Sequence, residues 1–229
     1  MKILELFSGT GSFSNVAKER GHEVFTVDFD KQFNPDLCIN ILDFDISMLP
    51  EEFQHPDVIW ASPPCTQYSH AKRTGIRDIE GANKIVEKTI EIIKELHPKI
   101  WIIENPQTGL LKKQPFMFGF HFEDVSYCKY GYPYRKQTRF WNNLEGFKGK
   151  TCNKDCEFMD GKKHILSAGN ARAMYCLKDI KKLAKEKYSG EAFELIERLT
   201  KHGLNKKDKY KVPKQLCLEL IKQCEKQLK

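Results

Sequence analysis

Residues 2–11 read KILELFSGTG, and this stretch decides the fold. An apolar run that stops at a turn containing two glycines is typical of a strand that ends in a loop. Residues 13–20 then have helical character and stop at Gly21. The first unit is therefore strand, glycine turn and helix. This unit predicts an α/β protein whose ligands bind beyond the carboxyl ends of parallel strands.

The alternation of strands and helices continues along the chain. Apolar residues at helical spacing predict an amphipathic helix over 79–97, which Pro98 ends. The fold class is therefore α/β and Rossmann-like, with a mostly parallel sheet and helices on both faces. The other expected elements are strands at 23–27, 37–41, 57–61, 99–103, 125–130 and 139–141, and helices at 177–187, 190–202 and 213–228.

Composition limits the protein's surroundings and partners. The 229 residues have a formal net charge of +7, and the basic excess lies after residue 144. A basic region indicates a polyanion such as nucleic acid, although a lysine-rich solvated surface explains it equally well. No apolar run is long enough to span a membrane, and the N-terminus reads as a strand rather than a leader. With eight cysteines, we expect a cytoplasmic monomer in a reducing compartment, without a membrane partner.

Candidate ligand-binding residues follow the first three strands. Gly9 and Gly11 allow a ligand to approach the backbone at a helix N-terminus. Asp28, about twenty residues further on, is placed to bind ribose hydroxyls, and Asp43 ends the third strand. The third glycine of a phosphate-binding fingerprint is missing. A nucleoside without a pyrophosphate therefore fits better, and S-adenosylmethionine is such a ligand.

A cysteine and an acid follow the next two strands. Cys65 comes after Pro63 and Pro64, which fix the backbone ahead of the thiol. A stiff platform suits a nucleophile, while the alternative is a buried small apolar residue. Glu104 ends the fifth strand.

A second group of cysteines lies in the irregular region after residue 144. Cys152, Cys156, His164 and Cys176 supply four sulfur and nitrogen ligands of the kind that hold a structural zinc. The alternative is ordinary loop cysteines, because this spacing is not diagnostic.

The motifs together resemble the cytosine-5 DNA methyltransferase family. Their order is LFSGTG at 6–11, PPC at 63–65, ENP at 104–106, QTR at 137–139 and VP at 212–213. The resemblance covers about residues 2–144 and 210–228. It implies a Rossmann-like S-adenosylmethionine-dependent methyltransferase fold. It divides the chain into a catalytic domain at 1–144, a small basic target-recognition region at 145–208, and a C-terminal helix at 209–229 that returns to the catalytic domain.

The resemblance also implies a mechanism with assigned roles. Cys65 attacks carbon 6 of a flipped-out cytosine, Glu104 holds ring nitrogen 3, and Arg139 binds the carbonyl oxygen. Phe7 packs on the cofactor, Asp28 binds its ribose and Asp43 its adenine. The remaining cofactor residues of these motifs are Gly9, Gly11, Pro63 and Val212, and the substrate residues are Ser69, on a mobile loop, Asn105 and Gln137.

The sequence departs from the family at three places and leaves other functions open. Pro106 stands where many members have Val, the QTR motif at 137–139 has one arginine instead of two, and Tyr210-Lys211 replaces Asn-Ser. One alternative is that the same chemistry acts on transfer RNA, although RNA is the less favoured partner. A catalytically silent nucleic-acid-binding relative is another. An exocyclic amino methyltransferase does not need the thiol of Cys65.

Overall fold

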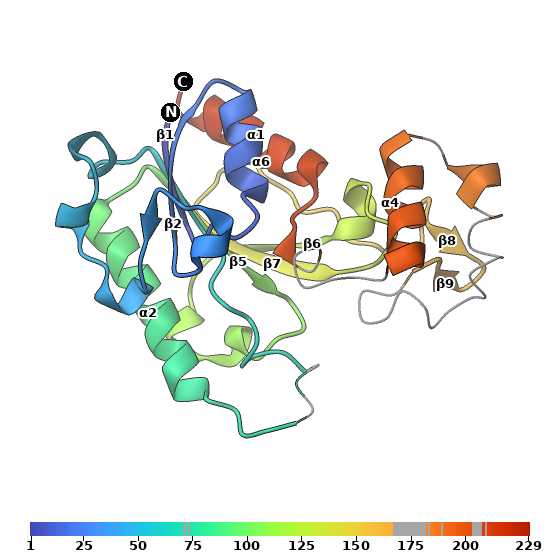
Figure 1. The fold of residues 1–229 in the computed structure, drawn as a ribbon, viewed down its shortest axis with the longest axis horizontal. Helices are drawn as coiled ribbons and strands as arrows, with labels where there is room; N and C mark the ends of the chain where they lie inside the picture. The colour runs from blue at the N-terminus through green and yellow to red at the C-terminus, as the bar shows by residue number, and fades with distance from the viewer. Residues whose placement is uncertain are drawn as a thin grey trace.

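The structure is a computed structural model that describes residues 1–70, 72, 74–166, 182, 184–188, 190–202, 208 and 210–229. A seven-stranded sheet forms its centre, in the order β3-β2-β1-β4-β5-β7-β6 (Figure 1). Strands β1 to β5 are parallel, and β7 runs antiparallel to both its neighbours. The bounds are β1 (Lys2–Leu6), β2 (Glu23–Asp28), β3 (Leu37–Cys38), β4 (Val58–Ala61), β5 (Ile100–Pro106), β6 (Phe122–Ser126) and β7 (Gln137–Asn142).

Alternating side chains of the strands form two cores, one on each face of the sheet. On one face, Ile3 and Phe140 pack with α1 (Ser12–Glu19) and α6 (Lys214–Gln227). On the other face, Leu4 and Trp141 pack with α2 (Ile79–Leu96). Figure 1 shows α6 lying beside α1, although some 200 residues separate them. The C-terminal helix therefore packs in the same core as α1, and this two-sided packing confirms the predicted fold class.

Helix α2 shows how local sequence sets the elements. The Asp78 side chain accepts a hydrogen bond from Gly81 N at 2.8 Å, which caps the N-terminus. His97 takes a left-handed conformation at the C-terminus, and Pro98 prevents the helix from continuing. The bounds agree with those expected from the sequence to within one residue.

Residues 152–166 and 190–202 belong to a smaller part beside the sheet, seen on the right of Figure 1. It contains a hairpin of β8 (Met159–Asp160) and β9 (Lys163–His164), and helix α4 (Gly190–His202). Phe158, Ile165 and Ile196 belong to a third core, which also includes Cys128 from the sheet side. Most of the helix expected at 177–187 lies outside the described residues.

Two of the predicted strands are wrong over part of their length. β3 is only two residues long, and Ile41–Asp43 forms a 3₁₀ turn. The strand expected at 125–130 is wrong over 127–130, since β6 runs from Phe122 to Ser126 and Tyr127–Tyr130 form a 3₁₀ turn, η7. Gly131 closes this turn with φ 87°. The chain therefore leaves the sheet after Ser126, and Tyr127 and Cys128 lie in the turn η7 rather than in β6.

Candidate active site

A cavity of about 440 Å³ lies at the carboxyl ends of the central strands. Its volume is within the range of small-molecule pockets, about 300–1,000 Å³. β1, β2, β4 and β5 each end at this cavity, as expected for a parallel sheet. The residues of the predicted site that line it are Phe7, Gly9, Asp28, Pro63, Cys65, Glu104 and Val212.

The glycine turn after β1 forms one wall of the cavity. Phe7, Gly9 and Gly11 all have positive φ, at 59°, 49° and 66°. Gly11 tolerates this conformation and precedes α1 directly, whereas Phe7 adopts it at a cost, a kind of strain that clusters at ligand sites. Gly9 N donates to Asp28 Oδ2 at 2.8 Å. The turn therefore fixes the carboxylate that ends β2.

The Asp28 carboxylate and the C-terminal segment complete this half of the cavity. Asp30 N donates to Asp28 Oδ1 at 2.9 Å, so backbone groups orient both carboxylate oxygens. Val212 N donates to Ser12 Oγ at 3.1 Å, which ties the entry of α6 to the start of α1. Glu5 on β1 also lines this cavity and is only 2% exposed. Burial raises the pKa of its carboxyl group to about 7.

Asp43 does not line this cavity. A second cavity of about 250 Å³ shares Phe7, Asp28 and Pro64 with the first one, and Asn40 and Ile41 lie in its wall. Asp43 is exposed within the 3₁₀ turn that follows. Asp43 therefore lines neither cavity, and its contact with adenine remains a prediction.

Cys65 stands on a turn that a buried amide holds in place. Asn105 is completely buried, and its Nδ2 donates to the carbonyl oxygen of Pro63 at 2.9 Å. Asn105 therefore orients the turn rather than lining the cavity. Burial raises the pKa of the Cys65 thiol, the positive charge of Lys136 opposes this rise, and Glu104 adds to it.

Glu104 faces the same cavity from β5 and has two partners from one segment. Tyr127 OH donates to Glu104 Oε1 at 3.3 Å, and Lys136 Nζ lies 3.9 Å from the same oxygen. The Lys136 ammonium also lies 4.8 Å from the centroid of the Tyr127 ring. The sequence analysis missed Tyr127 and Lys136, because neither lies at the end of a predicted strand.

Arg139 lies on the opposite face of the sheet from Glu104. Glu104 pairs directly with Phe140 across β5 and β7, so their side chains share a face and Arg139 points away. The Arg139 guanidinium binds both oxygens of Asp124, at 2.7 and 2.8 Å, and stacks on Phe122 at 3.5 Å. Arg139 therefore does not line the cavity, and Lys136 provides the positive charge in the cavity wall instead.

Ser69 and Gln137 also stand outside the cavity wall. Ser69 lies on the loop after Cys65, where the Arg77 guanidinium donates to the carbonyl oxygens of Ser69 and Gln67, both at 2.8 Å. Gln137 begins β7 and pairs with Ser126 on β6. Substrate contacts by these two residues therefore remain predictions.

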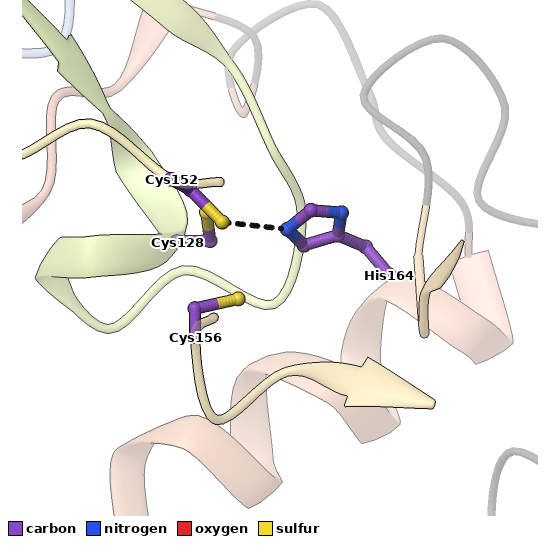
Figure 2. A group of neighbouring side chains, drawn as sticks. All are labelled: Cys128, Cys152, Cys156 and His164. Atoms are coloured by element: carbon purple, nitrogen blue, oxygen red, sulfur yellow. Dashed lines mark hydrogen bonds between the residues drawn. The ribbon is translucent and has the colours of Figure 1, made fainter. Parts of the chain in front are cut away.

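Three of the four predicted metal ligands lie together at a different place. Cys152, Cys156 and His164 meet Cys128, and their ligand atoms are all within 4.8 Å of one another (Figure 2). Cys176, the fourth predicted ligand, lies outside the described residues. Cys128 was missed because its position was read as part of a strand.

The strand order with β7 reversed, and the glycine turn at the cavity, define a Rossmann-like S-adenosylmethionine-dependent methyltransferase fold. The model of the family "C-5 cytosine-specific DNA methylase" matches residues 1–116. A probable DNA (cytosine-5)-methyltransferase of frog virus 3 is 37% identical over 169 residues, which cover 66% of this chain and 75% of that protein. The chain belongs to the C-5 cytosine-specific DNA methylase family.

Two further comparisons are more distant. The type II methyltransferase M.FnuDI of Fusobacterium nucleatum is 32% identical over 121 residues, which cover 50% of this chain and about a third (34%) of that protein. DNMT2 of Spodoptera frugiperda has a TM-score of 0.55 at 14% identity, covering 98% of this chain and 99% of that one, and it shows the same fold. Across the described residues, no helix combines the length and apolar character needed to cross a membrane.

Proposed function

We propose that this protein transfers a methyl group from S-adenosylmethionine to carbon 5 of cytosine in DNA. The observation that carries the proposal is that Cys65 and Glu104, from the ends of β4 and β5, line one cavity with the glycine turn after β1. One base bound in this cavity could thus contact the nucleophile and the carboxylate, with the cofactor held beside it at the glycine turn. Family membership and the viral relative support DNA as the polymer.

The cavity wall suits a nucleoside-containing cofactor. Phe7 offers a ring, the Asp28 carboxylate is held in place to accept hydrogen bonds from ribose hydroxyls, and the positive φ of Gly9 keeps a side chain out of the turn. Asn40 and Ile41 offer an adenine site. When bound, S-adenosylmethionine supplies an electrophilic methyl group to carbon 5.

The side chains of this protein activate the base. The Cys65 thiolate forms a bond to carbon 6, and the electron pair of the ring double bond moves toward carbon 5 and the N3 side of the ring. Glu104 holds a proton at nitrogen 3, and the Lys136 ammonium stabilises negative charge beside it. After methylation, a water molecule accepts the carbon 5 proton, and the electron pair of that C–H bond restores the C5–C6 double bond as the C6–S bond breaks and Cys65 leaves as thiolate.

Access to Cys65 sets the form of the substrate. Cys65 and Glu104 both lie in the wall of a cavity, and Glu104 is only 8% exposed, so a base that contacts both has to enter that cavity. We therefore propose that the target base is flipped out of the helix, and that the basic segment 145–208 contacts phosphates. We also propose that the protein acts as a monomer inside the cell; the seven cysteines that the structure describes form no disulfide.

Nucleoside mass spectrometry tests the chemistry and the polymer together. Duplex DNA and transfer RNA are incubated separately with S-adenosylmethionine and the protein, its Cys65→Ser variant, or Cys38→Ser as a matched control on an exposed thiol. We expect 5-methylcytosine in DNA, with the wild type and Cys38→Ser only. Formation in RNA alone contradicts the DNA assignment, and undiminished formation by Cys65→Ser contradicts the nucleophile.

A mechanism-based trap provides a second test of the covalent step. Duplex DNA with 5-fluorocytosine at the target position lacks the proton that must leave carbon 5, so the bond to Cys65 persists after methyl transfer. We expect a denaturation-resistant protein–DNA adduct with the wild type, mapped by peptide mass spectrometry to Cys65. An adduct at another residue, or methylation of ordinary DNA without any adduct, argues against this mechanism.

A further inference from the structure

Cys128, Cys152, Cys156 and His164 form a cluster outside the active site, which the proposed function does not use. Figure 2 shows the three sulfur atoms and the imidazole ring turned toward a common centre. Cys128 comes from η7 at the end of β6, Cys152 and Cys156 from the loop that follows residue 150, and His164 from β9. Four separate positions thus converge on one point.

The distances suit a tetrahedral metal ion. Zn–S and Zn–N bonds of about 2.3 and 2.0 Å place the ligand atoms about 3.5–3.8 Å apart. Cys152 Sγ lies 3.4 Å from His164 Nε2, and every pair in the cluster is within 4.8 Å. A shift of about 1 Å at the widest pair closes the site. Three thiols cannot all be paired in one disulfide, whereas a single zinc ion engages all of them.

The loop between Cys152 and Cys156 turns sharply at one residue. Lys154 takes a left-handed φ of 67°, and the sulfur atoms of Cys152 and Cys156, on either side of it, both belong to the cluster whose ligand atoms lie within 4.8 Å of one another. A single short loop therefore supplies two of the four ligands.

The cluster also has a structural purpose. The third core packs around Phe158 and Ile165, and a metal ion bound beside such a core contributes free energy to folding. Cys128 follows Tyr127, which donates to Glu104, and Cys152 N donates to Ser126 Oγ at 3.0 Å at the end of β6. Anything that ties Cys128 to the loop therefore ties the small region to the segment carrying Tyr127 and Lys136.

We propose that one structural Zn²⁺ ion binds to Cys128 Sγ, Cys152 Sγ, Cys156 Sγ and His164 Nε2, and fastens the smaller part, residues 152–166 and 190–202, to the active-site turn η7. Four protein ligands fill the tetrahedron, so the ion has no open position for catalysis. The site goes beyond the proposed function, because metal binding stands or falls independently of methyl transfer.

Metal analysis of the full-length protein tests the site directly. The protein is purified without chelators or a histidine tag, and its metal content is measured by elemental mass spectrometry. We expect about one zinc per chain. After exchange with Co²⁺, the absorption spectrum should show thiolate-to-metal charge-transfer bands and the d–d bands of a tetrahedral, sulfur-rich site. Cys156→Ser should lose these bands, whereas Cys38→Ser, an exposed thiol elsewhere, should keep them.

Thiol alkylation of the wild type keeps the test decisive if the variant fails to fold. Cys128, Cys152 and Cys156 should resist alkylation until a chelator removes the metal, while Cys38 reacts throughout. The proposal is overturned if the protein contains less than one zinc per chain and the addition of Zn²⁺ under reducing conditions does not restore the metal. Unchanged alkylation after chelation, or a disulfide between two of the three cysteines in reduced protein, overturns it too.

Discussion

Lys136 Nζ lies 3.9 Å from Glu104 Oε1, and this ammonium is the cation that the cavity wall presents beside Cys65. Lys136 directly precedes β7, and its carbonyl oxygen accepts a hydrogen bond from Tyr127 N at 3.0 Å. The two partners of the Glu104 carboxylate are therefore fixed to each other through the backbone. The positive charge of the site depends on the turn between β6 and β7 rather than on β7 itself.

Replacement of Lys136 by methionine should reduce the rate of methyl transfer by about 10²-fold or more, as loss of one charge-stabilising donor does. Binding of S-adenosylmethionine should change little. Because burial raises the pKa of the Cys65 thiol and the Lys136 charge opposes this, the variant should need a higher pH for adduct formation. Single-turnover rates against pH measure both effects, with Lys99→Met, on a 68% exposed side chain outside the basic segment 145–208, as the control.

Lys136→Arg separates charge from size. An arginine at this position retains the positive charge, so we expect activity between those of the wild type and Lys136→Met. Equal activity of wild type and Lys136→Met would return the role of the cation to another residue.

Substitution of Arg139 by alanine should affect stability more than chemistry. The guanidinium holds Asp124 with two hydrogen bonds, and its side chain is 13% exposed. Loss of this pair should lower the free energy of unfolding by about 1–3 kcal/mol, measured by urea denaturation. The rate of methyl transfer per folded molecule should stay near that of the wild type. A loss as large as that of Lys136→Met, at unchanged stability, would restore Arg139 to the active site.

Glu5→Gln should change how stability depends on pH. The carboxyl pKa of Glu5 is 4.5 in the unfolded reference and about 7 in the buried native position. The native state therefore holds a proton that the unfolded state releases between these values, and the free energy of unfolding falls as the pH rises through this window.

The size of the effect follows from the pKa difference. Glu5 should contribute a decrease of at most about 3 kcal/mol between pH 4.5 and 7, and Glu5→Gln should remove it. Urea titrations at several pH values compare the variant with the wild type and with Glu23→Gln, an exposed glutamate on β2. Identical pH slopes in all three proteins would contradict the assignment.

Asn105→Ala should release the turn that carries Cys65. The variant removes the donor to the Pro63 carbonyl oxygen, so the thiol is held less firmly opposite the base. We expect a lower kcat with little change in the KM for S-adenosylmethionine, and slower formation of the 5-fluorocytosine adduct. Asn105→Asp tests the donor, because a carboxylate of similar size cannot donate to a carbonyl. A change confined to cofactor binding would place Asn105 in the other half of the cavity.

The sequence by itself determined the fold class and most of the cavity. Apolar runs that stop at glycine, proline or acidic residues identify parallel strands and their ends, and parallel strand ends meet at one edge. The structure brings Gly9, Asp28, Cys65 and Glu104 to one cavity, as this pattern predicts, and their roles there remain predictions. Cys152, Cys156 and His164 were also grouped correctly, since they lie close in sequence.

Only the tertiary structure decided the face of Arg139, the active-site role of Lys136, and the approach of Cys128 to the other metal ligands. A strand has a side-chain period of two, so its register against β5 sends Phe140 to the Glu104 face and Arg139 to the other. Propensity cannot reveal that register, because packing of Trp60 with Phe140 and of the α2 face with Trp141 sets it. Likewise, β6 ends at Ser126 because long-range contacts form η7 there. Local pattern selects the elements, whereas contacts between distant segments select which side chains meet.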